Sequence, residues 1–104
     1  MKAKEIIKAY YDAWLKSDRD KARSFLADDL KFRTPNDSFD SADAFLDACW
    51  RHAAGFNTMT MLQEVYADDT AFIAYTSGDF TVGEVIKIRD GGIAEIFVTF
   101  NPTV

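Results

Sequence analysis

The sequence is poor in the residues that build disulfides and metal centres, because its 104 residues include one cysteine, Cys49, and one histidine, His52. A single cysteine cannot form a disulfide within the chain, which favours a reducing compartment such as the cytoplasm. No apolar run approaches the roughly 18 residues of a membrane-spanning helix, and the first residues lack the apolar stretch and cleavage site of a signal peptide. We therefore expect a cytoplasmic protein that does not span a membrane.

Concentrated positive charge is also missing from the sequence. The chain has 12 Lys and Arg against 17 Asp and Glu, which gives a net charge of −5, and its basic residues are scattered. Nucleic acids and anionic membranes both require a concentrated basic surface, so neither is expected as a partner. The sequence contains no internal repeat, low-complexity tract or linker, and its length suits a single domain over residues 1–104.

Apolar and aromatic residues, in contrast, are plentiful, at 48% and 14% of the chain. This composition excludes a disordered chain. Over residues 3–14 the apolar side chains recur every three or four positions, opposite lysines and aspartates, which predicts an amphipathic helix. Ser17 is expected to cap a second helix, with Asp20 completing an acidic capping box.

The middle of the chain predicts a strand followed by a third helix. Residues 30–34 alternate apolar and basic side chains, as in a half-buried strand that Pro35 ends at a turn. The helix is expected to begin after Asp40 or Ser41, either of which can cap it, and to end at Gly55. Its predicted apolar stripe consists of Phe45, Ala48, Cys49, His52 and Phe56.

The remainder of the chain changes to the period of strands. Four segments rich in Ile, Val, Thr, Phe and Tyr are joined by short turn signals, which predicts an antiparallel meander. Three helices followed by such a meander are typical of an α+β fold. We therefore predict helices packed on one face of a curved antiparallel sheet.

Four stretches covering nearly the whole chain carry a resemblance to a known superfamily: IIKAYYDAWLKSD, ARSFLADDLKFRTP, DSFDSADAFLDA and VIKIRDGGIAEI. In this order they resemble the nuclear transport factor 2-like superfamily, including its SnoaL-like and ketosteroid isomerase-like members. The sheet in this superfamily wraps around the helices as a cone that usually holds an apolar cavity. The resemblance therefore implies a cone-shaped fold with a pocket for a small apolar molecule.

Ketosteroid isomerases use an aspartate as the base, and a tyrosine with a protonated aspartate to stabilise the enolate. The resemblance places Tyr10 at that tyrosine and Glu84 at the protonated aspartate, but it places Thr34 at the base. A neutral hydroxyl cannot abstract a carbon-bound proton at neutral pH. Steroid isomerisation by that mechanism is therefore not expected. The Asp–Arg–Asp set of limonene epoxide hydrolase-like members also has no inward-pointing counterpart in this sequence.

Three residues are candidate catalytic groups, and each has a structural alternative. Tyr10 lies on the apolar face of the first helix, where it could equally be an ordinary core tyrosine. Glu84 shares strand parity with Ile86, which allows two interpretations. Either Glu84 points into the cone, where burial would raise its pKa, or it is an exposed carboxylate near a turn. His52 could act as a general base or be a packed core residue.

Other positions are expected to shape the cavity without taking part in chemistry. Cys49, three residues from His52, is interpreted as an inert, apolar thiol. The residues predicted to line a ligand are Trp14, Phe32, Thr34, Met61, Ile86 and Ile96. The sequence has no metal-ligand spacing, phosphate-binding loop or nucleophile elbow, so neither a metal nor a cofactor is expected.

The outer face of the sheet is expected to carry Lys87, Arg89, Glu95, Phe97 and Thr99. Phe97 is out of place on a solvent-exposed surface, and members of the superfamily commonly dimerise through this face, so we predict a homodimer.

Two functions stay open. One is a pocket for a small apolar, carbonyl-bearing molecule, with isomerase, cyclase or hydrolase-like activity. The other is a non-catalytic dimeric module for binding or protein interaction, because fold alone does not fix function.

Overall fold

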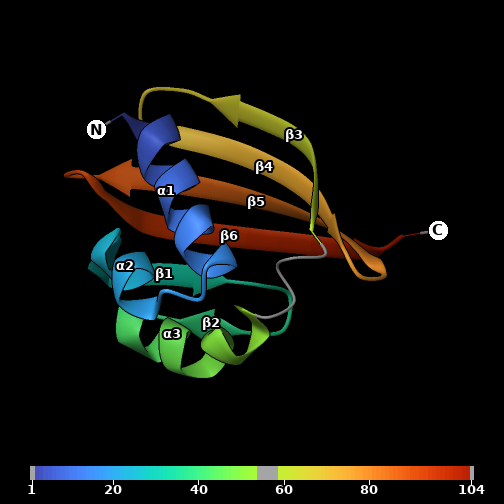
Figure 1. The fold of residues 1–104 in the computed structure, drawn as a ribbon, viewed down its shortest axis with the longest axis horizontal. Coiled ribbons are helices and arrows are strands. Elements are labelled where there is room, and N and C mark those ends of the chain that lie inside the picture. Colours follow the sequence, from blue (N-terminus) through green and yellow to red (C-terminus); the bar gives the residue numbers. More distant parts are fainter. Residues whose placement is uncertain (1, 54–58, 104) are drawn as a thin grey trace.

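The computed structural model describes residues 2–53 and 59–103. Over these residues the chain forms three α-helices and six β-strands (Figure 1). The helices are α1 (Ala3–Leu15), α2 (Arg19–Ser24) and α3 (Ala42–Cys49). The strands are β1 (Leu26–Arg33), β2 (Ser38–Phe39), β3 (Thr60–Tyr66), β4 (Thr70–Ser77), β5 (Phe80–Arg89) and β6 (Gly92–Pro102). The helices lie on one face of the sheet, and the predicted α+β fold is confirmed.

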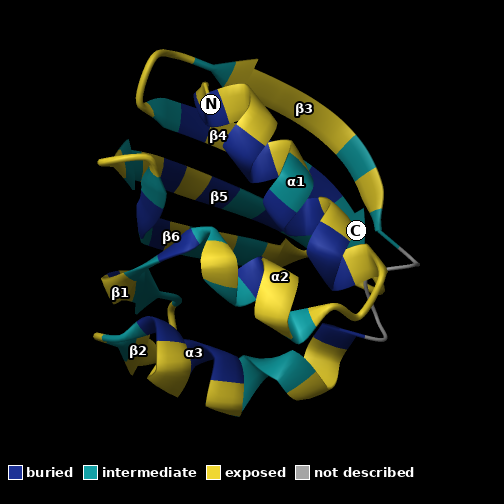
Figure 2. Cartoon of the chain, turned by 60° about the vertical axis from the view of Figure 1, so that its left-hand side comes forward, coloured by how far each residue is buried: buried dark blue, intermediate teal, exposed yellow. Residues whose placement is uncertain are grey.

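The first helix presents a wide apolar face to the sheet. Its three- and four-residue spacing buries Ile6, Ile7, Tyr10 and Trp14, as predicted. Tyr11 is buried as well, at 7% exposure, because the strands curve around α1 and cover more than one side of it (Figure 2). Both adjacent tyrosines of this helix therefore point into the interior. Within the described residues, no helix is long and apolar enough to cross a membrane.

The predicted helix caps are right for α3 and wrong for α2. The hydroxyl of Ser41 accepts a hydrogen bond from the backbone N–H of Ala44 at 3.0 Å, which confirms the cap of α3. The cap of α2 is Asp18, whose carboxylate accepts from the backbone N–H of Lys21 at 3.1 Å. Ser17 instead has a φ of 55° and belongs to the left-handed turn that closes α1. Its side chain is therefore not the cap.

The six strands form one sheet in the order β2-β1-β6-β5-β4-β3. Strands β3 to β6 make the predicted antiparallel meander. Strand β1, however, pairs parallel with β6 and antiparallel with β2, so the prediction of a purely antiparallel sheet is wrong at the β1–β6 pairing. β1 also begins at Leu26 rather than at Leu30, and the two-residue strand β2 was not predicted.

The inner face of the sheet forms the core together with α1. Ile73, Ile86 and Ile96 lie on neighbouring strands and are at most 1% exposed. Glu84 lies on this same face because side chains alternate along β5, and it is only 6% exposed. Its predicted inward parity is therefore confirmed.

The third helix is shorter than its predicted apolar stripe. Phe45 is buried and Cys49 is half-buried, after which the chain passes into a 3-10 turn over residues 50–53. A 3-10 turn has three residues per turn, so side chains leave the face that an α-helix would have continued. His52 is consequently exposed, and its predicted place on a buried stripe is wrong. The predicted positions Gly55 and Phe56 lie outside the described residues.

Candidate functional site

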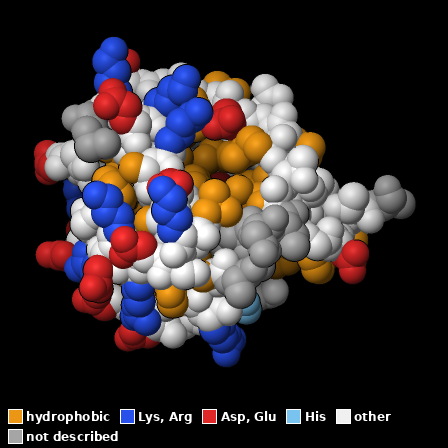
Figure 3. Space-filling model, in the orientation of Figure 1, with side chains coloured by type: hydrophobic (Ala, Val, Ile, Leu, Met, Phe, Trp, Pro, Cys, Tyr) orange, Lys and Arg blue, Asp and Glu red, His pale blue; other side chains and the backbone are white. Residues whose placement is uncertain are grey.

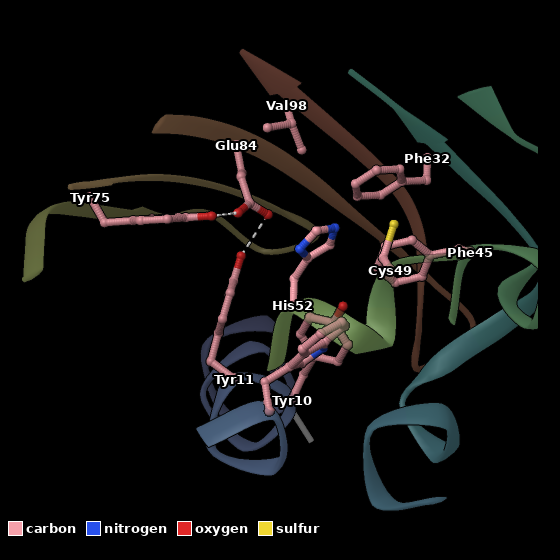
Figure 4. Close-up of a pocket in the computed structure, with 10 residues that line it drawn as sticks. Tyr10, Tyr11, Phe32, Phe45, Cys49, His52, Tyr75, Glu84 and Val98 are labelled. Carbon is pink, nitrogen blue, oxygen red and sulfur yellow. Dashed lines mark hydrogen bonds between the residues drawn. The ribbon is translucent and has the colours of Figure 1, made fainter. Parts of the chain in front are cut away.

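A pocket of about 170 Å³ lies between α1, α3 and the inner face of the sheet (Figure 4). Its walls are almost entirely apolar and aromatic, and a small number of polar groups converge on it. The residues that line it are Tyr10, Tyr11, Trp14, Phe32, Phe45, Cys49, His52, Tyr75, Glu84 and Val98. An apolar cavity with a few converging polar groups is the usual form of a small-molecule site.

The polar centre of this pocket is a carboxyl group held by two tyrosines. The hydroxyl of Tyr11, from α1, donates to Oε1 of Glu84 at 2.7 Å. The hydroxyl of Tyr75, from β4, donates to Oε2 of the same carboxyl group (Figure 4). Tyr75 reaches Glu84 because Ile73 is the cross-strand partner of Glu84, which makes Tyr75 its diagonal neighbour on the same face. Three different elements thus fix one carboxyl group.

Burial controls the protonation of this cluster. Removal from water raises the pKa of Glu84, and the hydrogen bonds from Tyr75 and Tyr11 oppose that shift without cancelling it. Burial also raises the pKa of Tyr11 and of Tyr75, and the nearby Glu84 raises both further. The tyrosines therefore stay protonated as hydrogen-bond donors. Glu84 therefore keeps its proton to a higher pH than an exposed glutamate does.

Tyr10 occupies the neighbouring position on the same helix. Burial raises its pKa, with a smaller contribution from Glu84, while a hydrogen bond with Trp14 acts in the opposite direction. Its hydroxyl is therefore also neutral and available for hydrogen bonding. The rings of Tyr10 and Trp14 meet edge to face, with centroids 6.3 Å apart.

The rest of the wall is built from stacked aromatic rings. Phe32 of β1 stacks on Phe45 of α3 with ring centroids 4.3 Å apart, and Trp14 lies 4.3 Å from Trp50. Such pairs hold one another in place and present flat apolar surfaces to a ligand. Aromatic rings thus make up much of the pocket wall.

The structure brings together most of the residues that the sequence singled out. Tyr10, Glu84 and His52 all line the pocket, and so do Trp14 and Phe32. His52 approaches from the turn after α3, and Figure 4 shows its ring on the same side of the cavity as Cys49. Burial raises the pKa of the Cys49 thiol, which agrees with its interpretation as an unreactive group.

Four predicted lining residues lie elsewhere. The hydroxyl of Thr34 accepts from the backbone N–H groups of Asn36 and Asp37, at 3.1 and 2.9 Å, so it shapes the turn after β1. Ile86 and Ile96 are cross-strand partners inside the core, where side chains cover them completely. Met61 lines a separate hollow on the other side of Tyr11.

Sequence reasoning missed the two tyrosines that hold Glu84. The signal for Tyr75 was present, because Ala71, Ile73 and Tyr75 alternate along β4 and all three are buried. Tyr11 carried a signal too, because it lies eight positions after Ala3, and a wide apolar helix face includes the positions i, i+3, i+4, i+7 and i+8. Its burial depends on how far the sheet curves around α1.

Within the described part of the chain, no group of three or more His, Cys, Asp or Glu side chains is arranged to hold a metal ion. The polar groups that line the pocket include the carboxyl of Glu84, the hydroxyls of Tyr10, Tyr11 and Tyr75, and the imidazole of His52.

Comparison with protein families matches residues 7–96 to the SnoaL-like domain. The chain belongs to the SnoaL-like domain family. This confirms the resemblance to the wider nuclear transport factor 2-like superfamily that the order of the sequence segments indicated. A search of curated proteins finds no match.

Several solved structures share the fold of this SnoaL-like chain. A protein from Kribbella flavida has a TM-score of 0.83 and 22% identity, over 93% of this chain and 84% of that one. A candidate polyketide cyclase from Sinorhizobium meliloti has a TM-score of 0.73 and 22% identity, over 90% and 93%. An LEH-like epoxide hydrolase from M. tuberculosis has a TM-score of 0.72 and 16% identity, over 93% and 80%. At these identities the likeness establishes the fold.

Proposed function

We propose that this SnoaL-like protein binds a small apolar molecule bearing a carbonyl or similar oxygen, and that Glu84 exchanges a proton or a hydrogen bond with that oxygen. One observation carries the proposal: a buried carboxyl group, held by the hydroxyls of Tyr11 and Tyr75, faces an otherwise apolar pocket. A buried carboxyl whose pKa is raised keeps its proton to a higher pH than an exposed one, which suits it to donate that proton as an acid. Isomerase, cyclase and hydrolase-like reactions without a cofactor all fit this chemistry.

The size of the pocket limits the ligand. Its volume of about 170 Å³ is close to that of an engineered cavity of roughly 150 Å³ that holds one benzene molecule. Pockets for larger, drug-sized ligands start at about 300 Å³. The ligand proposed here is therefore a single-ring or similarly short molecule, and a four-ring steroid exceeds the space.

The polar groups divide into distinct roles in this proposal. Because both tyrosine hydroxyls donate to Glu84, the proton of its acid form is available to a ligand oxygen. Tyr10 is a second neutral donor on the same wall. His52, at the exposed end of the pocket, can accept a proton from the ligand and pass it to solvent. Thr34 has no part in this chemistry, because its hydroxyl is engaged in a turn.

We also propose that the protein acts as a homodimer through the outer face of its sheet. An apolar row crosses four strands there, because Val65, Phe72, Val85 and Phe97 are successive cross-strand partners. These side chains are 53%, 43%, 37% and 41% exposed, which is unusual for large apolar residues arranged side by side. The edge of the Phe72 ring lies beside Gly83, where the missing side chain leaves room for it. A second copy of the same face would cover it.

The first test measures the binding of single-ring ketones and epoxides. Intrinsic tryptophan fluorescence detects this binding, because Trp14 lines the pocket. Turnover of each bound compound is then measured for the natural protein and for Glu84→Gln. We expect micromolar to millimolar binding and a loss of turnover of about 10² to 10⁴-fold in Glu84→Gln, which is typical for removal of a general acid or base. Glu95→Gln is the matched control, because Glu95 lies on the adjacent strand and outside the pocket.

Two outcomes would contradict the proposal. If no compound of this class binds at millimolar concentration, the pocket is not a small-molecule site. If compounds bind and turn over equally in both variants, Glu84 is not the acting group. Binding without any turnover would support the alternative of a non-catalytic binding module.

A further inference from the structure

A second hollow lies on the opposite side of Tyr11 from the pocket with Glu84. It runs between α1 and β3, has a volume of about 270 Å³, and is lined by Lys8, Tyr11, Asp12, Leu15, Met59, Met61, Glu64, Tyr66 and Ile73. Figure 3 shows hydrophobic side chains gathered in this hollow, with charged groups around its rim. The proposed function above makes no use of it.

The floor of the hollow is apolar and adaptable. Two methionines, Met59 and Met61, are half-buried there, and Leu15 of α1 is 50% exposed. Thioether side chains have several rotatable bonds and a polarisable sulfur, so they adjust to ligands of different shape. Binding of a ligand that removes this exposed apolar surface from water is therefore favourable.

Positive and negative side chains at the rim are equal in number, which argues against an occupant with a large net charge. Asp12 forms an ion pair with Lys16 at 2.9 Å. Glu64 accepts a hydrogen bond from the hydroxyl of Tyr66 at 2.9 Å, and burial together with this bond raises the pKa of Tyr66 to about 12. Lys8 also lines the hollow, so the formal charges of Lys8, Lys16, Asp12 and Glu64 sum to zero.

We propose that this hollow between α1 and β3 is a second binding site, specific for an uncharged apolar molecule of about two fused rings. The size of this ligand follows from the volume of the hollow. At about 270 Å³, the hollow is larger than the inner pocket of about 170 Å³ by roughly the space that one more ring needs. The ring of Tyr11 separates the two cavities, and its hydroxyl is tied to Glu84 on the inner side. The site is independent of whatever reaction occurs at Glu84.

Two sets of reporters distinguish the cavities. The methyl groups of Met59 and Met61 report on the outer hollow, and the indole of Trp14 reports on the inner pocket. The experiment is an NMR titration of the full chain, labelled with ¹³C at the methionine methyls and ¹⁵N at the indoles, with 2-naphthol and with phenol. We expect 2-naphthol to shift the Met59 and Met61 methyl signals with saturation below 1 mM, and to leave the Trp14 indole signal in place. Phenol, with one ring, should reach the inner pocket.

Variants then locate the binding. Leu15→Lys and Met61→Lys should each weaken the binding of 2-naphthol at least tenfold, because a charge enters the apolar floor. Leu15 is half-exposed, so its variant is expected to fold normally. Leu62→Lys is the matched control, since Leu62 is a 55% exposed neighbour of Met61 that does not line the hollow.

The proposal is overturned if 2-naphthol shifts neither methionine methyl up to 1 mM, or shifts the Trp14 indole alone. It is equally overturned if the affinity for 2-naphthol is the same in Leu15→Lys as in Leu62→Lys. Failure of the proposed function at Glu84 would not change these results, because that function is measured at the inner pocket with single-ring compounds.

Discussion

Glu84 owes its properties to two opposing influences on one side chain. Burial among apolar residues disfavours its ionised form, while two tyrosine hydroxyls stabilise that form by hydrogen bonding. The net result is a raised pKa, so the carboxyl holds its proton at higher pH than an exposed glutamate does. A carboxyl in this condition makes the stability of the protein depend on pH.

The first prediction concerns that dependence. The carboxyl pKa of an unfolded glutamate is about 4.3, and the folded value lies above it. The resulting stabilisation is fully present below about pH 4.3 and is lost as the pH rises through the folded value, by about 1.4 kcal/mol for each unit of difference. We expect the free energy of unfolding in urea to fall, relative to Glu84→Gln, as the pH rises from 4 to 8. Parallel pH profiles of the two proteins would contradict this prediction.

A second prediction separates a turn residue from a ligand residue. The Thr34 hydroxyl accepts two backbone hydrogen bonds in the turn after β1. Thr34→Ala should therefore lower the free energy of unfolding by about 1 kcal/mol, the usual contribution of such bonds. Ligand affinity in the pocket should be unchanged, and Thr34→Ser should restore the stability. If Thr34→Ala kept its stability but lost ligand affinity, Thr34 would be a ligand-binding residue and not a turn residue.

Individual residues were predictable wherever one local rule decided their position. Strand alternation put Glu84 on the same face as Ile86, although an exposed carboxylate stayed open as the alternative, and helix spacing placed Tyr10 and Trp14 on the buried face. The same rules misplaced Met61, because they give the side of an element and not which of two cavities a side chain enters. Tyr11 fits the helical spacing counted from Ala3, but its contact with Glu84 also requires the sheet to curve around α1, which no local pattern contains.

Among the elements, α3 has an N-cap whose removal by one substitution can be tested directly. It brings Phe45 and Cys49 to the pocket, and its start is fixed by the hydroxyl of Ser41. Loss of an N-cap typically costs about 1 kcal/mol. We expect Ser41→Ala to lower the free energy of unfolding by that amount and to speed amide hydrogen exchange in α3. Ser41→Asp, which retains a capping oxygen, should behave as the natural protein. Unaltered exchange rates in Ser41→Ala would show that packing alone fixes the helix.

The elements that sequence reasoning misjudged are those that depend on distant partners. The first half of β1 is interrupted by Asp28 and Asp29, and its register with β6 shifts between Leu26 and Lys31, so alternation is visible only from Leu30 onward. Strand β2 has only two residues and exists because Phe39 pairs with Phe32. The parallel pairing of β1 with β6 joins segments at opposite ends of the chain, and no pattern within either strand reports it.

At the scale of the whole molecule, the apolar row on the outer sheet face predicts the oligomeric state. A stable interface buries roughly 800 Å² on each partner and is dominated by a few central aromatic side chains. We expect light scattering at tens of micromolar to give the mass of a dimer. Phe97→Lys should raise the dimer dissociation constant at least tenfold, about 1.4 kcal/mol, because it replaces one of the two aromatic side chains of the row with a charge.

Phe80→Lys is the control for this experiment. Phe80 is as exposed as Phe72, at 43%, but it lies at the end of the β4–β5 hairpin and outside the row. Its substitution should leave the dimer intact. A monomer mass for the natural protein, or equal dissociation constants for both variants, would reject the homodimer.

The position of β6 has a consequence for how the protein comes together during synthesis. This strand is the last in the chain, yet it lies in the middle of the sheet, between β1 and β5. The helices and β1 are synthesised before β3, β4 and β5, so the edge of β1 that pairs with β6 stays unpaired during the synthesis of these strands. Only the arrival of β6 joins the two halves, and contacts between such distant segments form slowly. Phe32 and Glu84, which line one pocket, lie on strands that are connected in the sheet only through β6.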